Sequence, residues 1–322
     1  MMLERLTQSF GPSGREKEIT QVISEYVTPF SDEVYTDALG NLIAHKKGNG
    51  KKIMLAAHMD EIGVAVTYID EKGFLRFSKI GGLYQRRLLN RRVRFSNGFT
   101  GVIDTEENNK DYNIQKMYID IGATDREQAE KMVSVGDMAV FEGEYKEEYG
   151  VIISKALDNR AGCYILIKVL EQIKSENDIY FCFTSQEEVG LRGAKAAAYS
   201  VNPEYALAVD VTDTGDTPNC PKMAVNLGGG AAVKVMDRSV ITNPDVRIKL
   251  IELAKKNNIP YQLEIMTDGG TDAGAIHTSR EGVKTGGVSV PTRYIHSPSE
   301  MVSKKDLEAC IKLIKAFCES NL

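Results

Sequence analysis

Five residues with metal-binding side chains stand along the chain, each where an apolar run ends or beside a turn. Two are histidines and three are carboxylates: His58, Asp158, Glu188, Asp210 and His296. One aspartate placed among two histidines and two further carboxylates is what a pair of metal ions with a shared, bridging carboxylate requires. Glu187 directly precedes Glu188 and is then free to act as the base that activates water. The pattern predicts a two-metal hydrolase.

Each of these motifs has an ordinary explanation when it is taken alone. His58 can be hydrogen-bonded in a turn, Asp158 can cap a helix, and Glu187 and Glu188 can belong to a hydrophilic loop. Side chains two apart on an extended segment share a side, so Asp60 can orient His58 or polarise the site from behind it. The joint occurrence of all the motifs in this order favours the metal site over the separate explanations.

A glycine-rich segment at residues 269–274 precedes a short helix, for which Thr271 is the expected cap. The alternative is a wall beside the substrate, with Asp272 supporting the metal ligands. We expect the loops around residues 230–240 and 266–272 to form the pocket for the substrate's N-terminal side chain. Asp213 and Asp216 fit turn residues, and His45 and His277 lack the setting of His296, which a Ser-Pro-Ser loop presents.

The elements that position these residues alternate between strand and helix. Buried strands are expected at residues 53–57, 179–183, 205–209 and 283–290, and helices at 3–10, 16–28, 158–173, 191–200, 244–257 and 304–319. Such alternation predicts an α/β fold with a mostly parallel central sheet flanked by helices. Binding sites in these folds form at the carboxyl ends of the strands, where the candidate ligands stand.

Residues 64–152 do not show this alternation of strand and helix. Their pattern predicts short strands, and Asn97-Gly98 is a hairpin turn signal between two of them. Their single helix is expected to begin with a capping box at Thr124. We therefore expect an inserted small β-barrel or β-sandwich over residues 64–152. Residues 1–63 and 153–322 then form the catalytic domain.

The composition narrows the class of protein. A net charge of −5 argues against nucleic acid or an anionic membrane as the main partner. The basic stretch at residues 86–94 is interrupted by apolar residues, which favours a solvated strand face or a subunit contact. No apolar run reaches the length of a membrane helix or of a signal-peptide core. Five cysteines without a C-x-x-C motif suit a reduced, cytoplasmic protein.

Six motifs together resemble those of the tetrahedral (TET) aminopeptidases, and the similarity spans essentially the whole chain: AHMDEIG, KALDNRAG, TSQEEVGLRGA, AVDVTDTGDTP, GGTDAGAI and YIHSPSEM. The resemblance implies a zinc-peptidase-like catalytic domain and two metal ions that share Asp158. It gives one ion Glu188 and His296 as further ligands, and the other His58 and Asp210. Glu187 is implied as the acid–base residue and Asp60 as its support. The insertion resembles the family's dimerisation domain, and a homododecamer built from dimers is implied. Two positions in the insertion depart from the expected pattern: Leu83 replaces an aromatic residue and Asn90 replaces a glycine.

The expected reaction is therefore hydrolysis of the first peptide bond of substrates with a free N-terminus, using Zn²⁺ or Co²⁺. One alternative is a metal-dependent deacylase or carboxypeptidase of related fold, which would use the same metals on a different substrate. An endoglucanase, a label often given to this family, leaves both histidines unexplained, and the chain has no Trp to stack on sugars. A non-catalytic assembly gives no reason to retain Glu187.

Overall fold

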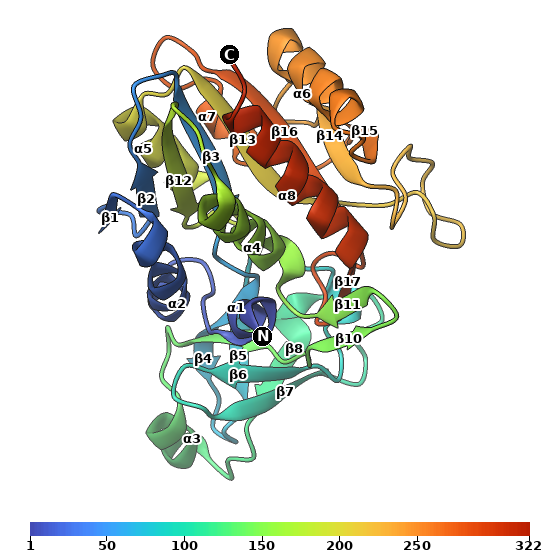
Figure 1. Cartoon of the computed structure of the whole chain (residues 1–322). Helices are drawn as coiled ribbons and strands as arrows, with labels where there is room; N and C mark the ends of the chain where they lie inside the picture. The colour runs from blue at the N-terminus through green and yellow to red at the C-terminus, as the bar shows by residue number, and fades with distance from the viewer.

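The apolar run at residues 53–57 becomes a central strand of an 11-stranded sheet in the computed structural model, which describes residues 1–322 (Figure 1). The strands of this sheet are β1 (Glu33–Thr36), β2 (Leu42–Lys46), β3 (Lys52–His58), β10 (Lys146–Glu148), β11 (Val151–Ser154), β12 (Asp178–Thr184), β13 (Tyr205–Thr212), β14 (Ala231–Met236), β15 (Tyr261–Ile265), β16 (Lys284–Arg293) and β17 (Glu300–Ser303). The central strands run parallel in the order β12, β3, β13 and β16. Their outer neighbours β2, β14 and β17 pair antiparallel. The predicted parallel sheet is confirmed at the centre, and the whole sheet is mixed.

Helices cover both faces of the sheet, as the sequence predicts. They are α1 (Met2–Gln8), α2 (Lys17–Val27), α4 (Leu157–Gln172), α5 (Arg192–Val201), α6 (Pro244–Lys256), α7 (Ala273–Ile276) and α8 (Lys304–Cys318). Side chains alternate along β3, so Leu55 and Ala57 pack in a core with α4 and α8, while Met54 and Ala56 pack with α5 and α7. None of the helices combines the length and the apolar character that crossing a lipid bilayer requires.

The register of the parallel strands determines which residues meet at the edge of the sheet. Thr184 at the end of β12 lies opposite His58 at the end of β3. In β13, Ala208 pairs with Ala56, so His58 and Asp210 each lie two residues beyond that pair. The expectation that β13 ends at residue 209 is wrong. Its pairing with β16 continues to Thr212, so Asp210 projects from within a strand.

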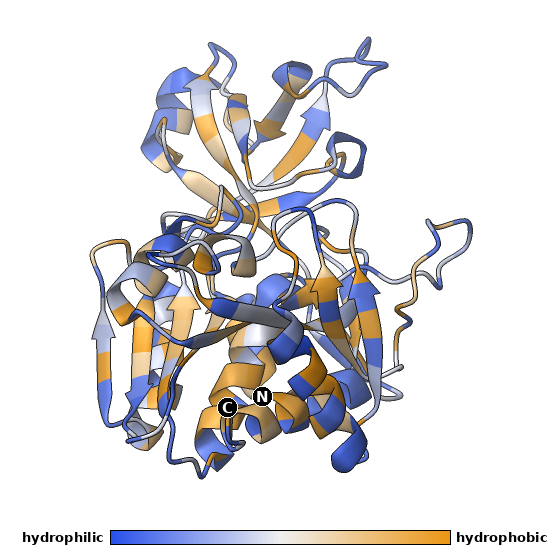
Figure 2. Ribbon diagram, turned by 90° about the horizontal axis from the view of Figure 1, so that it is seen from above, coloured by the Kyte–Doolittle hydropathy of each residue, from blue (hydrophilic) through white to orange (hydrophobic).

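The insertion between β3 and β10 is a closed barrel in the order β4-β5-β8-β7-β6-β9, which Figure 2 shows as a separate lobe at the top of the view. Its elements are β4 (Gly63–Ile69), β5 (Leu75–Ile80), β6 (Arg92–Phe95), β7 (Thr100–Thr105), β8 (Met117–Asp120), α3 (Arg126–Met132) and β9 (Met138–Phe141). Eighteen buried hydrophobic residues form its own core. Leu83 contributes to this core, and Asn90 adopts the positive φ of 59° that explains the expected glycine.

The expected domain boundary at residue 152 falls inside β11, which belongs to the large sheet. β10 pairs with β11, and β11 pairs with β17, so the chain has returned to that sheet by Lys146. The barrel itself ends with β9 at Phe141. The short strands β10 and β11 resemble barrel strands in composition, and only their pairing partner separates them from the insertion.

Two expected helix caps are displaced by one residue. Asp125, not Thr124, caps α3, because its Oδ1 accepts a 2.9 Å hydrogen bond from the backbone N–H of Gln128. The side chain of Gln128 accepts from the N–H of Thr124, the residue before the cap, so only one of the two hydrogen bonds of a capping box forms. In the glycine-rich segment the residue before α7 is Asp272, and the Thr271 hydroxyl donates to Asp237 instead.

Candidate metal centre

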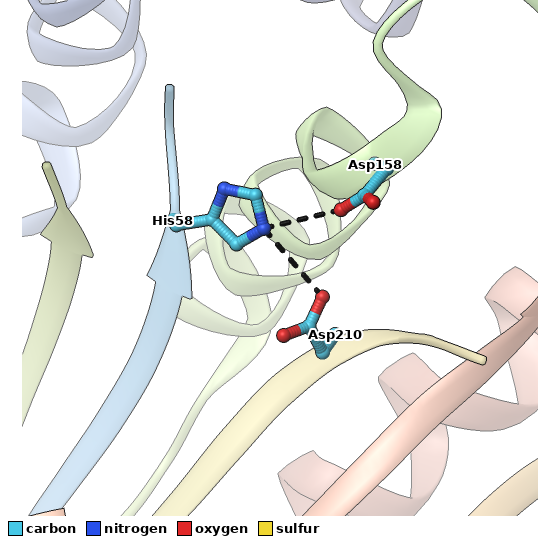
Figure 3. Close-up of side chains that lie close together, drawn as sticks. All are labelled: His58, Asp158 and Asp210. Atoms are coloured by element: carbon cyan, nitrogen blue, oxygen red, sulfur yellow. Dashed lines mark hydrogen bonds and ion pairs between the residues drawn. The ribbon is translucent and has the colours of Figure 1, made fainter. Parts of the chain in front are cut away.

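The edge of the central strands brings the five predicted ligands into one cluster. His58 ends β3, and Asp210 lies in the neighbouring strand β13. Glu188 follows β12, Asp158 lies in the first turn of α4, and His296 lies in the loop between β16 and β17. Figure 3 shows His58, Asp158 and Asp210 converging from three different elements. The sequence prediction that these side chains meet is confirmed by their positions.

Asp158 occupies the middle of the cluster, with its two carboxylate oxygens facing different histidines. Oδ1 lies 3.1 Å from His58 Nε2, and Oδ2 lies 3.2 Å from His296 Nε2. Two groups of potential ligand atoms result, each with its atoms within 4.8 Å of one another, and both contain Asp158. A carboxylate that offers one oxygen to each of two groups has the arrangement of a bridging ligand.

The remaining members complete one group on each side of Asp158. Asp210 Oδ1 lies 3.7 Å from His58 Nε2, and Glu188 Oε1 lies 3.2 Å from His296 Nε2. Glu188 Oε1 is buried and makes no hydrogen bond, so it is a buried acceptor in need of a partner. Imidazole nitrogens and carboxylate oxygens in these groups are ligands that Zn²⁺ and similar divalent ions accept. The side chains present therefore fit a metal pair.

The electrostatics of the cluster point in the same direction. Burial alone would lower the pKa of His296, but Glu188 and Asp158 raise that pKa to about 12. Burial likewise opposes protonation of His58, yet Glu187, Asp158 and Asp60 raise its pKa well above the ordinary value. The histidines respond to an excess of buried negative charge. Divalent cations would neutralise the same excess.

Glu187 lies beside the two groups and belongs to neither of them. Its Oε2 is 3.9 Å from His58 Nε2, and its side chain is only 12% exposed. Burial, together with Asp210 and Glu188, raises the pKa of Glu187 well above the usual value for a glutamate. A carboxyl group with a raised pKa next to a metal site can exchange a proton with a bound substrate or water.

Asp60 supports the loop that carries both glutamates. Its Oδ1 accepts a 3.0 Å hydrogen bond from the N–H of Glu187, and its Oδ2 accepts from the N–H of Glu188 at 3.3 Å. The Ser13 hydroxyl donates to the same Oδ2 at 2.5 Å. The carboxylate also lies 3.5 Å from His58 Nδ1, so it contacts both the histidine and the loop. The expected role of Asp60 behind His58 thus matches its surroundings.

Sequence reasoning missed Glu300, a buried residue at the start of β17. Its Oε2 accepts a 2.9 Å hydrogen bond from the N–H of Asp158, and its Oε1 accepts a 2.8 Å hydrogen bond from the N–H of His296. One carboxylate therefore connects the backbones of two candidate ligands from separate elements. Its position four residues after His296 gave no signal of this role, because both contacts are to backbone groups.

Asp272 also lies close to the cluster, through a residue of β12. Its Oδ2 accepts a 2.5 Å hydrogen bond from the hydroxyl of Thr184, which pairs with His58 in the sheet. Burial raises the pKa of Asp272 to about 6. The suggestion that Asp272 supports the ligands agrees with this position. Asp272 is only 2% exposed and does not line the cavity, so the wall beside the substrate is formed by the nearby residues Gly269 and Gly270.

A cavity of about 790 Å³ opens onto the metal cluster and contains all five candidate ligands and Glu187. Residues 266 and 268–270 of the expected loop 266–272 line it, but residues 230–240 do not. The loop after β13 lines the cavity in their place. Of the two expected turn residues in this loop, Asp213 lines the cavity, whereas Asp216 forms an ion pair with Arg293 at 2.8 Å. The cavity is large enough for a short peptide end.

The barrel also takes part in this cavity, through the segment between β5 and β6. Tyr84 and Arg87 line it, so one exposed residue of the basic stretch lies in the wall of the site. Gly82 passes so close to His296 that an added Cβ would lie 2.9 Å from the imidazole ring. A side chain at position 82 would therefore displace a candidate ligand.

Two histidines stay outside the site, as the sequence indicates. His45 stacks on Tyr180 with ring centroids 4.0 Å apart, and its Nε2 lies 2.6 Å from Asp178. His277 Nδ1 bonds to the carbonyl of Ala273 within the short helix. Both histidines have local partners that explain them.

Comparison with known proteins places the whole chain among peptidases. The family model described as M42 glutamyl aminopeptidase matches residues 40–313. A relative from Acetivibrio thermocellus, named as an aminopeptidase, is 53% identical over 98% of both chains.

Solved structures agree with the sequence comparison. The aminopeptidase APDkam598 from Desulfurococcus kamchatkensis superposes with a TM-score of 0.95 at 41% identity, over 99% of this chain and 93% of its own. The TET1 peptidase of Pyrococcus horikoshii, which can assemble into a tetrahedron or a large octahedral shell, gives 0.89 at 36% identity over 98% of both chains. The fold and the barrel insertion are thus those of known aminopeptidases.

Proposed function

The chain belongs to the M42 glutamyl aminopeptidase family and is a metal-dependent aminopeptidase, and on that premise we propose how its residues divide the reaction. Asp158 would be shared by two divalent ions, Zn²⁺ or Co²⁺. Glu188 and His296 would be the further ligands of one ion, and His58 and Asp210 those of the other. The single observation that carries this assignment is the position of the two Asp158 oxygens, 3.1 Å and 3.2 Å from the two histidines.

When bound, the two ions polarise the scissile carbonyl and lower the pKa of a water molecule. Glu187 receives the proton of that water at its carboxylate as the oxygen attacks the carbonyl carbon. The same carboxyl group gives the proton to the amide nitrogen as the C–N bond breaks, which releases the N-terminal residue. The burial that raises the pKa of Glu187 supports the first transfer, because it makes the carboxylate a stronger base than an exposed one.

The proposed substrate is a peptide with a free α-amino group. Such a group is a cation at neutral pH, and the lining of the cavity includes two carboxylates, Asp213 and Asp268, that are not among the proposed metal ligands. N-acylation removes this charge and adds bulk at the same place. The carboxylates therefore favour an N-terminal amine over a blocked end, which supports an aminopeptidase over a deacylase. The carboxypeptidase alternative gains no support from the comparisons. One similar solved structure, from Thermotoga maritima, is named an endoglucanase, but that activity leaves both histidines of the cluster without a role.

We further propose that the barrel at residues 63–141 mediates dimerisation and that six dimers form a homododecamer. The assembly of the similar TET1 peptidase into a tetrahedron supports this proposal. A cytoplasmic setting, without nucleic acid or membrane as partner, belongs to the same proposal. Its support is the net charge of −5 and five cysteines with free thiols.

Hydrolysis of a panel of aminoacyl-p-nitroanilides tests the proposed reaction. The full-length protein is depleted of metal, reloaded with Zn²⁺ or Co²⁺, and assayed with free-amine substrates and with N-acetylated copies of each. We expect metal-restored cleavage of the free-amine series alone. Cleavage of only the acetylated series would instead establish a deacylase. The panel also reports the side-chain preference.

A further inference from the structure

A second cavity, of about 670 Å³, lies against α5 and shares no lining residue with the metal cavity. Side chains of α5, of α7 and of the residues after α7 line it, among them Leu39, Arg192, Lys195, Tyr199, Ala275 and Arg280. Three of its lining residues are cations, and none is an aspartate or glutamate. This concentration of positive charge stands out in a chain whose net charge is −5.

The three cations have no anionic partner within the chain. Neither Arg192, Lys195 nor Arg280 takes part in any of its ion pairs. Uncompensated like charges that share a concave surface raise its potential and attract anions. The positive charges in the cavity are therefore not neutralised by other residues of the chain and are available to an anionic ligand.

The cavity brings these side chains together from two segments, and contacts with Tyr199 hold Arg280. Arg192, Lys195 and Tyr199 follow one another at helical spacing and share a face of α5. Arg280 lies beyond the end of α7, with its guanidinium carbon 3.9 Å from the centre of the Tyr199 ring and its Nε donating a 2.7 Å hydrogen bond to the Tyr199 carbonyl. The two Nη groups of Arg280 make no hydrogen bond and remain available to a ligand.

We propose that this cavity binds a phosphate oxyanion, either inorganic phosphate or the phosphate group of a small metabolite. Two guanidinium groups and one ammonium group suit a dianion with several acceptor oxygens, because arginine binds phosphate through paired hydrogen bonds. The volume suits a small molecule, and Leu39, Tyr199 and Ala275 provide an apolar surface for its organic part. The site does not depend on the proposed peptidase chemistry.

The site is adjacent to the loop that carries the catalytic glutamates. Arg192 Nη1 donates a 3.2 Å hydrogen bond to the side chain of Gln186, the residue before Glu187. Phosphate held by Arg192 would bind the same guanidinium that contacts Gln186. One hydrogen bond therefore links the phosphate cavity to the loop that carries Glu187 and Glu188.

Calorimetric titration of the metal-loaded, full-length enzyme with inorganic phosphate tests the proposal. An amino-acid hydroxamate occupies the metal centre, so that phosphate cannot bind there. The variant Lys195→Glu reverses one exposed charge in the cavity, at a side chain with no recorded hydrogen bond or ion pair. The control Lys79→Glu makes the same charge change at an exposed, unpaired position of the barrel. Thermal unfolding of both variants checks that the fold is kept.

We expect one phosphate per subunit, at least about tenfold weaker binding in Lys195→Glu, and unchanged binding in Lys79→Glu. Adenosine monophosphate and adenosine distinguish the two sources of phosphate. Tighter binding of the monophosphate than of inorganic phosphate, with none of adenosine, identifies a phosphorylated metabolite. Tighter binding of inorganic phosphate identifies the free ion. The absence of saturable binding, or equal binding by the enzyme and both variants, would overturn the proposal.

Discussion

The backbone N–H of Glu187 donates a 3.0 Å hydrogen bond to Oδ1 of Asp60. This bond joins the proposed acid–base residue to the segment that follows His58, across 127 residues of sequence. Asp60 is fully buried, and His58 lowers its pKa although burial opposes ionisation. The charged carboxylate thus sets the position of the loop from which Glu187 projects.

Replacement of Glu187 by Gln removes the proton acceptor and preserves size and shape. We expect kcat to fall by about 10²–10⁴-fold, the range that acid–base groups contribute. The metal content should stay at that of the unchanged enzyme, since Glu187 is outside both ligand groups. Steady-state kinetics with metal analysis of the same sample checks both points. A variant with nearly full kcat would assign the proton transfer to another group.

Asp158→Asn and Asp210→Asn distinguish a shared ligand from a ligand of one ion. Asp158 belongs to both groups of potential ligand atoms, and Asp210 to one of them. We expect the first variant to lose both ions on dialysis and the second to retain one. Metal analysis by mass spectrometry after dialysis gives the stoichiometry. Loss of only one ion from Asp158→Asn would contradict the bridging position.

Glu300→Gln tests the residue that connects two ligand backbones. The carboxylate accepts hydrogen bonds from the N–H groups of Asp158 and His296, and an amide can accept only one of them. We expect metal affinity to fall by about 10–100-fold, as for other groups that orient metal ligands. Competition with a fluorescent chelator measures the affinity. Unchanged affinity with unchanged stability would make Glu300 an ordinary buried residue.

Metal binding should release protons at neutral pH. Glu188 and Asp158 raise the folded-state pKa of His296 to about 12, so its proton stabilises the metal-free protein fully below the ordinary pKa near 6.5. That contribution is lost as the pH rises toward the folded value. Bound ions require the neutral imidazole, so metal affinity should increase with pH. Calorimetry in buffers of different ionisation enthalpy counts the protons. An affinity that stays constant between about pH 6 and pH 9 would contradict this linkage.

The ion pair beneath the site is predicted to contribute to stability. Lys155 Nζ lies 2.6 Å from Glu61 Oε2, and both side chains are buried. Glu61→Gln leaves Lys155 without a counter-charge and should lower the free energy of unfolding by about 3–5 kcal/mol. Glu204→Gln breaks the exposed pair with Lys51 and should change it little. Urea unfolding of the metal-free variants makes the comparison. Equal effects would show that burial does not matter here.

The sequence predicts the ligands because each follows a strong local signal. Apolar runs place His58 and Glu188 at strand ends, and the start of an apolar helix stripe places Asp158. The strand β14 escaped prediction since Lys234 interrupts its apolar pattern. In the structure Glu264 and Asp237 neutralise this fully buried lysine. Glu300 escaped because both of its contacts are to backbone groups, and the true end of β13 escaped because it depends on pairing with β16, which is distant in sequence.

Titration of the metal-depleted enzyme with Zn²⁺, followed by cleavage of a free-amine aminoacyl-p-nitroanilide, tests the central claim most directly. The proposed centre predicts no cleavage without metal, maximal cleavage at two ions per subunit, and none in Asp158→Asn at any metal concentration used. An N-acetylated copy of the substrate should remain intact throughout. Full cleavage by the metal-depleted enzyme, or by Asp158→Asn, would contradict a two-metal aminopeptidase built around Asp158.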